Sequence, residues 1–269
     1  MRKRRVALAL GSGGAKGFAH VGVLKAFDEH QIQVDVVTGS SMGSLVGAFY
    51  VTGMRPDFME RLASSLRWRH WIDLRVPKLG LIGGDKVWEM VKLLTRGLAI
   101  EELDRPFAAV ATDLVARRAV ILRSGLLADA VRASIAIPGV FVPLRKGGQV
   151  LVDGGVIERV PVAAARALGA DLVIGVDVST GTRPSVPETM LDVIMQSLDI
   201  MQEQLLVHHP ADLLIAPDLS SVGTSHFHKA KEAIRLGYEA AQAKMPDIVA
   251  LLGSRTEAYP TSVDRPPQR

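Results

Sequence analysis

Residues 34–50 read VDVVTGSSMGSLVGAFY, and three successive patterns are visible in them. Residues 34–38 are mostly apolar and β-branched, which predicts a buried strand. Residues 39–43 match Gly-x-Ser-x-Gly, and the spacing of apolar residues over 41–50 predicts a helix. A serine in a sharp turn between a strand and a helix is the arrangement of a nucleophile elbow. Ser41 is therefore the candidate nucleophile.

Two glycines flank this serine. Gly39 and Gly43 lack a Cβ, so the chain can turn tightly there without side-chain clashes. Ser41 then lies at a helix N-terminus, where the backbone dipole favours negative charge. The alternative interpretation is an ordinary glycine–serine turn, since the chain has 25 glycines. The strand before the turn and the helix after it favour the functional interpretation.

Short apolar runs and helical patterns alternate along the rest of the chain. The predicted strands are 5–10, 34–38, 107–111, 119–122, 150–152, 172–176 and 211–216. The predicted helices are 18–30, 41–50, 55–66, 85–95, 125–135, 162–168, 187–207 and 229–252. Such alternation predicts strand–helix units packed around a parallel sheet.

The 269 residues contain no visible repeat and no clear linker. We expect one domain over 1–253 and a loose tail over 254–269, where Ser, Thr, Pro and Arg replace most apolar residues. The basic residues 2–5 and the apolar run after them imitate a signal peptide, but that run ends at Gly11. We therefore expect a buried first strand with a solvated basic lead-in.

The composition excludes several classes of protein. With 48% hydrophobic and 22% charged residues the chain is globular rather than disordered. Zero cysteine excludes a disulfide scaffold, a thiolate metal site and a cysteine nucleophile. A net charge of +4 is too small to predict nucleic-acid binding, and no run of 18 apolar residues predicts a membrane span. We expect a cytoplasmic protein; nothing in the sequence predicts its oligomeric state.

A second glycine-rich turn, GSGGAKG at 11–17, follows the first predicted strand. The amides around Gly13 and Gly14 lack side-chain shielding and can bind an anion, although a plain turn is the alternative. A phosphate-binding P-loop is excluded because Lys16 is not followed by Ser or Thr. Lys16 also stands where a dinucleotide fingerprint needs its third glycine. An oxyanion hole serving Ser41 fits better, because parallel strands would bring both turns to one sheet edge.

A third turn, Asp153-Gly154-Gly155, ends the predicted strand over 150–152. The glycines allow a sharp bend that holds the carboxylate toward a cleft, whereas the plainer interpretation is a solvated Asp-Gly turn. Because an ordinary Asp has a pKa near 3.9, Asp153 would need a partly desolvated site to act as a general base.

These three turns, in their order along the chain, resemble the signature of the patatin-like phospholipase family. That signature is a glycine-rich oxyanion loop ending in Lys/Arg-Gly, a Gly-x-Ser-x-Gly elbow and an Asp-Gly-Gly/Ala turn. Residues 133–139, ASIAIPG, and the sequence through Pro143 are also similar to the family's segment before the aspartate. The resemblance extends over about residues 5–180.

The resemblance implies a three-layer α/β/α fold with a mainly parallel central sheet. It also implies a Ser–Asp dyad without histidine, with Ser41 as nucleophile and Asp153 as base. The amides of Gly13, Gly14 and Met42 would hold the oxyanion, and no metal or organic cofactor is required. The residues that support these turns are Gly11, Ser12, Lys16, Gly17, Gly39, Gly43, Gly154 and Gly155.

Two positions depart from the family's pattern. Ser12 stands where many relatives have a third consecutive glycine, and Glu158-Arg159 stands where relatives often carry Asn-Pro. Neither position carries a reacting atom. The departures leave open how the oxyanion loop and the segment after Asp153 are supported.

The expected activity is hydrolysis of lipid carboxylic esters through an acyl-Ser41 intermediate, of phospholipase, lysophospholipase or esterase type. One alternative is an α/β-hydrolase triad completed by His208, His209, His226 or His228. Another is a non-catalytic regulatory or binding module on the same scaffold. The presence of both Ser41 and Asp153 argues against this alternative. These histidines have no recognisable metal-ligand spacing, and His20 is expected to be structural.

A tryptophan-rich region suggests how a lipid surface is met. Trp68 and Trp71 are three residues apart, so a helix would place them on one face. Basic residues surround them, namely Arg67, Arg69, Arg75 and Lys78. One interpretation is ordinary packing, which would also account for Trp88. The other is a membrane-facing lid hinged at Gly80, Gly83 and Gly84, which predicts peripheral membrane contact.

Overall fold

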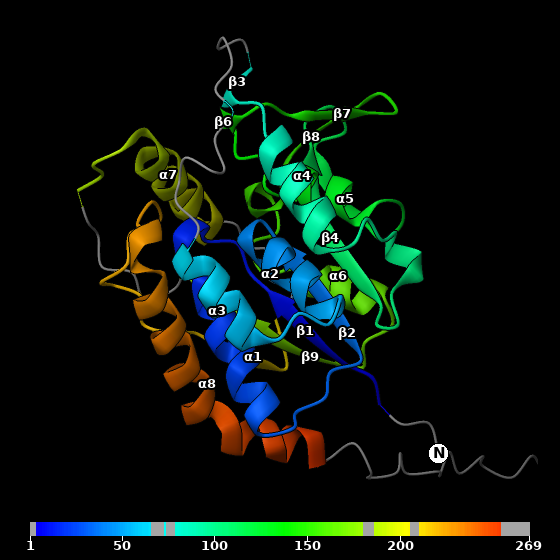
Figure 1. Cartoon of the computed structure of the whole chain (residues 1–269), viewed down its shortest axis with the longest axis vertical. Coiled ribbons are helices and arrows are strands. Elements are labelled where there is room, and N and C mark those ends of the chain that lie inside the picture. Colours follow the sequence, from blue (N-terminus) through cyan, green and yellow to red (C-terminus); the bar gives the residue numbers. More distant parts are fainter. Residues whose placement is uncertain (1–3, 66–72, 74–78, 180–185, 205–209, 254–269) are drawn as a thin grey trace, which may run out of the picture.

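A mixed β-sheet forms the centre of the computed structural model (Figure 1). The structure describes residues 4–65, 73, 79–179, 186–204 and 210–253. Within these residues the sheet has eight strands in the order β10-β9-β1-β2-β4-β8-β7, with β5 paired to β4. The strands are β1 Val6–Leu10, β2 Val36–Ser40, β4 Phe107–Asp113, β5 Arg118–Leu122, β7 Leu144–Lys146, β8 Gln149–Asp153, β9 Leu172–Val176 and β10 Leu213–Ile215.

The strands in the middle of the sheet are parallel and buried. β1 pairs in parallel with both β2 and β9, and β2 pairs in parallel with β4. Every residue of β1, β2 and β9 is buried, as near-continuous apolar runs predict for strands covered on both faces. β5 and β8 run antiparallel to β4, so β8 enters the sheet from the opposite direction to β2.

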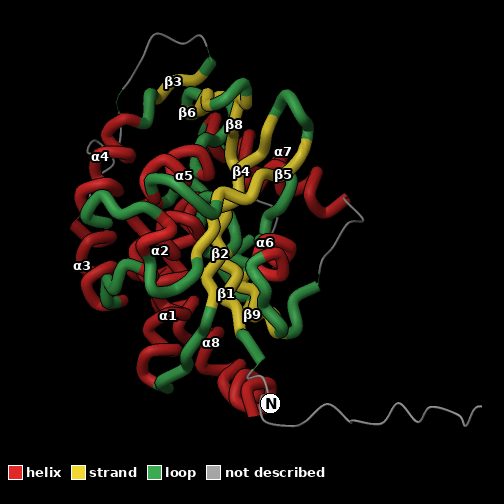
Figure 2. The backbone as a smooth tube through the Cα atoms, turned by 90° about the vertical axis from the view of Figure 1, so that its right-hand side faces the viewer, coloured by secondary structure: helices red, strands yellow, loops and turns green. Residues whose placement is uncertain are grey.

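Helices cover both faces of this sheet, which confirms the expected α/β/α layering (Figure 2). The helices are α1 Ala19–Glu29, α2 Met42–Val51, α3 Pro56–Ser65, α4 Asp85–Leu94, α5 Leu127–Ser134, α6 Val162–Ala167, α7 Met190–Gln204 and α8 Ala230–Gly253. Short 3₁₀ turns are η1 Gly14–Phe18, η3 Ile100–Glu102, η4 Gly154–Val156 and η5 Phe227–Lys229. The predicted tail over 254–269 lies outside the described residues, and the one-domain assignment stays a prediction.

The side chains of β1 alternate between two of the apolar clusters that make up the core. Leu8 and Leu10 pack into the larger cluster with residues of α1, α2 and α8. Ala7 and Ala9 point to the other face and pack against α6. The small alanines let α6 lie close to the sheet.

A separate pair of short strands lies above the sheet edge in Figure 1. β3 (Gly80–Ile82) and β6 (Gly139–Phe141) pair in parallel, and Ile82 packs with Ile137 and Val140. Gly80, expected as a hinge, therefore lies in a strand, and Gly83 donates its amide to the Asp73 carbonyl. None of the described helices is long and apolar enough to cross a membrane.

Candidate active site

Ser41 occupies the sharp turn between β2 and α2. Its backbone has φ 51° and ψ −124°, a conformation that non-glycine residues rarely adopt. A Cβ at Gly43 would overlap the Leu10 carbonyl oxygen, and a Cβ at Gly39 would overlap Ser44 Cα. The two flanking glycines are therefore required by close backbone contacts. Backbone strain of this kind is typical of functional sites.

Two neighbouring serines hold the backbone of this turn. The Ser41 amide donates to Ser134 Oγ at 3.0 Å, and Ser134 Oγ donates to the Val110 carbonyl at 2.6 Å. Ser44 Oγ donates to the Ser41 carbonyl at 2.7 Å. Sequence reasoning did not identify Ser134 as a supporting residue, although it lies inside the ASIAIPG segment that carried part of the resemblance.

The Ser41 hydroxyl donates a hydrogen bond of 2.5 Å to Asp153 Oδ2. Asp153 is the last residue of β8 and lies opposite Ala111 of β4, while Ser40 of β2 lies opposite Val110 on the other side of β4. The Asp153 amide donates to the Ala136 carbonyl at 2.9 Å, which fixes the end of the strand. The structure thus brings together two residues that the sequence separates by 112 positions.

Burial controls the protonation of Asp153. Loss of solvation raises the pKa of this carboxyl group from 3.8 to about 7, while hydrogen bonds from the Ser41 hydroxyl and the Gly155 amide act in the opposite direction. The Gly155 amide lies 2.8 Å from Asp153 Oδ1. A group with a pKa near neutrality is matched to accepting and returning a proton at physiological pH.

The glycine-rich loop after β1 lies beside the serine. Gly14 borders the same cavity as Ser41 and Met42, and a Cβ at Gly17 would overlap the Met42 side chain. Within the described residues, the amides of Gly13, Gly14 and Met42 donate to no protein acceptor. Gly14 and Met42 line the cavity, and the expected role of these amides in holding an oxyanion stays a prediction. Lys16, which precedes the last glycine of the motif, is buried.

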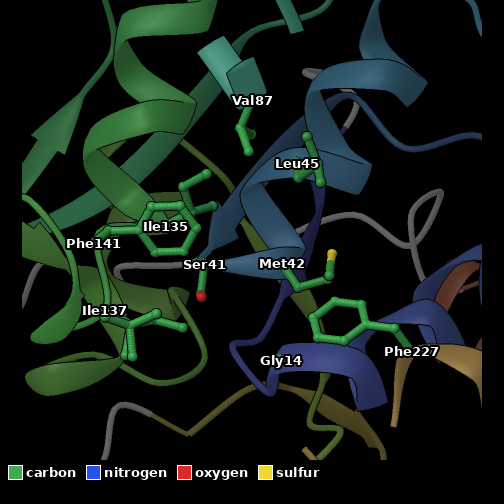
Figure 3. Close-up of a pocket in the computed structure, with 10 residues that line it drawn as sticks. Gly14, Ser41, Met42, Leu45, Val87, Ile135, Ile137, Phe141 and Phe227 are labelled. Carbon is green, nitrogen blue, oxygen red and sulfur yellow. The ribbon is translucent and has the colours of Figure 1, made fainter. Parts of the chain in front are cut away.

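An apolar cavity opens over the serine hydroxyl (Figure 3). Its lining is drawn from α2, α4, η5, β6 and the segment after α5. The apolar lining residues are Met42, Leu45, Val87, Ile135, Ile137, Val140, Phe141 and Phe227. In the view of Figure 3, Val87 and Leu45 lie at the opposite end from Ile137 and Gly14. The cavity offers apolar surface next to the Ser–Asp pair, as an acyl chain requires.

The described histidines do not complete a triad. His226 Nδ1 accepts from the Gly223 amide at 3.0 Å, and the His226 and His228 rings lie 5.3 Å apart. None of the histidines in the described part of the chain hydrogen-bonds to Ser41 or Asp153. His208 and His209 lie outside that part. The described site pairs the serine with a carboxylate.

His20 has the structural position expected of it. The side chain is fully buried, and its Nε2 lies 2.8 Å from the Gly11 carbonyl oxygen. Burial lowers the pKa of His20 to about 4, so its imidazole is neutral at pH 7. A neutral ring that donates from Nε2 holds the start of the glycine-rich loop.

The two departures from the family's pattern have definite contacts. The Ser12 amide donates to the Arg159 carbonyl at 2.9 Å. A Cβ at Gly155 would overlap Ser12 Oγ, so the serine packs directly on the Asp-Gly-Gly turn. Glu158 Oε1 accepts from the Ala163 amide at 2.8 Å in the first turn of α6. Arg159 thus supports the glycine-rich loop, and Glu158 supports the helix α6, which follows Asp153.

One of the three tryptophans lies in the described region, and its contacts are those of packing. Trp88 Nε1 donates to Asp129 Oδ1 at 2.8 Å, which joins α4 to α5, and the Lys92 ammonium lies 4.8 Å from the Trp88 ring centroid. Trp68 and Trp71 lie outside the described residues, as do Arg67, Arg69, Arg75 and Lys78.

Fold and site together define a class of protein: a three-layer α/β protein with a strained serine elbow, a buried carboxylate partner and free amides beside them. The patatin-like phospholipase family model matches residues 8–166, which is more than half of the chain. The chain belongs to the patatin-like phospholipase family, as the sequence motifs predicted.

Three curated relatives of this chain are longer than it is. It is 42% identical to an uncharacterized NTE family protein of Mycobacterium tuberculosis, over 65% of this chain and 49% of the relative. It is 36% identical to mouse patatin-like phospholipase domain-containing protein 6, over 65% of this chain and 14% of the relative. It is 28% identical to lysophospholipase NTE1 of Pyricularia oryzae, over 88% of this chain and 18% of the relative. The chain thus spans half or less of these relatives.

Solved structures show the same fold. VipD from Legionella pneumophila matches with a TM-score of 0.66 over 91% of this chain and 67% of VipD. The two sequences are 15% identical. Fold similarity at this identity confirms the architecture predicted from the alternating pattern.

Proposed function

We propose that this chain hydrolyses carboxylic esters of lipids, with Ser41 as the nucleophile and Asp153 as the general base. The observation that carries the proposal is the 2.5 Å hydrogen bond from Ser41 Oγ to the buried Asp153 carboxylate. Membership of the patatin-like phospholipase family supports it. The relative from Pyricularia oryzae named as a lysophospholipase supports the lipid as substrate.

The first half of the reaction forms an acyl-enzyme. Asp153 accepts the hydroxyl proton as Ser41 Oγ bonds to the ester carbonyl carbon. The carbonyl oxygen gains negative charge, which the amides of Gly13, Gly14 and Met42 stabilise. The bond from the carbonyl carbon to the alkoxy oxygen then breaks, and the leaving alcohol takes the proton from Asp153. The acyl group remains on Ser41.

The second half releases the fatty acid. A water molecule gives a proton to Asp153 while its oxygen bonds to the acyl carbon. The same amides stabilise the second oxyanion. Ser41 Oγ then leaves the carbon and recovers a proton from Asp153. The dyad returns to its starting state, and the scheme requires no metal or organic cofactor.

The cavity suggests where the acyl chain binds. Its apolar lining lies directly beside the serine hydroxyl, so burial of the chain there contributes to binding through the hydrophobic effect. The alcohol portion would lie on the side away from this lining. Phospholipids, lysophospholipids and simple esters all satisfy this requirement.

Contact with a membrane surface belongs to the same proposal. A cytoplasmic enzyme would meet the lipid through the basic, tryptophan-containing segment around Trp68 and Trp71. Replacing both tryptophans by alanine should weaken vesicle binding while hydrolysis of a short soluble ester survives. Equal loss of both properties would instead indicate a packing role.

Activity on a short 4-nitrophenyl ester tests the proposed chemistry. Ser41→Ala and Asp153→Asn should each lower the rate by about 1,000-fold or more while the fold, followed by circular dichroism, is retained. His226→Ala and His208→Ala should keep near-normal rates. An active Asp153→Asn variant together with an inactive histidine variant would favour the triad. An inactive wild-type chain on all esters would favour a non-catalytic module.

A further inference from the structure

An ion pair joins the segment after Asp153 to the segment after β9, and neither of its residues lines the apolar cavity. Arg159 Nη2 and Asp177 Oδ2 are 3.3 Å apart, with side chains 15% and 6% exposed. The second carboxylate oxygen of Asp177 accepts from the Ser179 amide and hydroxyl at 3.0 and 2.7 Å. Asp177 is thus held at both oxygens and has little contact with water.

Each member of the pair is attached to one side of the loop. The Arg159 carbonyl accepts the Ser12 amide at 2.9 Å. Asp177 directly follows Val176, whose carbonyl accepts the Gly11 amide at 2.9 Å. In the sheet register, Leu10 of β1 lies opposite Val176 of β9, so the loop and Asp177 leave neighbouring strands side by side.

Close packing makes the loop sensitive to these supports. A Cβ at Gly13 would lie 2.5 Å from Cγ2 of Val178, which is the residue after Asp177. On the opposite side, a Cβ at Gly14 would lie 2.6 Å from the Thr224 carbonyl oxygen. The loop therefore fills a narrow space between the segment after β9 and the segment before η5. A shift of either wall displaces the Gly13 and Gly14 amides.

We propose that Arg159 and Asp177 are positioning residues that hold the Gly13 and Gly14 amides in place for the oxyanion. The pair connects the two chain segments that accept the Ser12 and Gly11 amides, and it thereby fixes the segment after β9, which is the wall that Gly13 faces. This inference rests on the proposed ester hydrolysis.

The test compares transition-state and ground-state binding in Arg159→Met. Losing one oxyanion donor costs about 100- to 1,000-fold in rate, so a displaced loop should lower kcat by about 10- to 100-fold. KM for a short ester should change by less than about 3-fold. Binding of a trifluoromethyl ketone, which forms a tetrahedral adduct with a serine, should weaken by the same factor as kcat. Binding of the matching methyl ketone should be unchanged.

Two further variants separate positioning from simple stability. Asp177→Asn keeps the shape of the side chain and should reproduce the kcat loss, whereas Arg159→Lys keeps the charge and should restore part of the rate. Arg166→Met is the matched control, because it removes a partly exposed ion pair with Asp212 that does not touch the loop. The control should keep kcat and both inhibitor affinities.

The outcomes distinguish the two proposals. Should Arg159→Met lower only the melting temperature, with kcat per probe-labelled site unchanged, the pair is structural and the inference is wrong. Equal weakening of both ketones would also overturn it, since a general collapse of the cavity would then explain the loss. A wild-type chain without esterase activity would contradict the proposed function itself.

Discussion

Ser41 Oγ and Asp153 Oδ2 form a 2.5 Å hydrogen bond, although Ser41 directly follows β2, Asp153 ends β8, and these two strands run in opposite directions. The strand β4 lies between β2 and β8 and sets their spacing. β8 pairs with the C-terminal part of β4 and ends at Asp153 opposite Ala111, while β2 ends at Ser40 opposite Val110, so the carboxylate lies at the level of the elbow. Burial there raises the pKa of Asp153 to about 7.

The pH dependence of ester hydrolysis should follow the ionisation of the Asp153 carboxyl group. Only the ionised carboxylate accepts the Ser41 proton, so kcat/KM for a neutral short ester should rise through about pH 7 and level off above it. The measurement is kcat/KM from pH 5 to 9 at constant ionic strength. A profile that is flat across pH 5–8 would show that Asp153 is not the base.

Asp153 should also change the pH dependence of stability. Its folded pKa is raised from 3.8 to about 7, so the folded state binds more protons than the unfolded state between these values. The stability contributed by this group is therefore present at low pH and lost as pH rises through 7. Asp153→Asn removes that loss.

His20 changes the free energy of unfolding with pH in the opposite direction, because its folded pKa is lowered from 6.5 to about 4. Its contribution is lost as pH falls from 6.5 toward 4. The two effects partly cancel in the wild-type chain. Urea unfolding at pH 5, 6 and 7 should thus show Asp153→Asn gaining stability relative to wild type as pH rises. A constant difference would contradict the raised pKa.

Ser134 should be a support of the elbow. Ser134→Ala leaves the buried Ser41 amide and Val110 carbonyl without this partner, so it should cost about 1–3 kcal/mol of unfolding free energy. The rate should also fall by about 10-fold or more, because the strained turn is less firmly held. Ser64→Ala is the control, since Ser64 makes an exposed bond to a helix carbonyl. Equal effects of the two changes would exclude a special role for Ser134.

The cavity predicts a chain-length preference. Val87 lies at one end of the lining, so Val87→Phe should shorten the space for an acyl chain. Activity on a 12-carbon ester should fall by about 10-fold or more, while activity on a 4-carbon ester changes little. Leu93→Phe, on the exposed side of the same helix, should change neither. Equal loss of activity on both esters would show that the acyl chain of the substrate does not bind along Val87.

Much of the fold follows from local patterns. The core strands are predicted because fully buried strands need continuous apolar runs, as β1 and β9 show. The three-residue strands β3, β6 and β7 are too short to show any alternation. The antiparallel direction of β8 was also not predicted, because the partner of a strand is fixed by tertiary packing rather than by its own residues.

The candidate site shows a similar division. Ser41, Asp153 and the glycine-rich loop carry local motifs, so sequence reasoning could name them. Ser134 and the Arg159–Asp177 pair make contacts between distant segments. Ser134 lies in the ASIAIPG segment and Arg159 is one of the departures from the family's pattern, but no local pattern shows what these side chains contact. Their importance depends on which chain segments the fold places side by side.

Reaction with a fluorophosphonate probe tests the central claim most directly, because it requires an activated serine but no chosen substrate. The account predicts that the folded wild-type chain is labelled on the peptide containing Ser41, and that Ser41→Ala is not labelled. The Asp153→Asn variant should react with the probe at least about 100-fold more slowly than the wild-type chain. An unlabelled wild-type chain, labelling of another serine, or an Asp153→Asn variant that reacts at the wild-type rate would contradict the Ser41–Asp153 dyad.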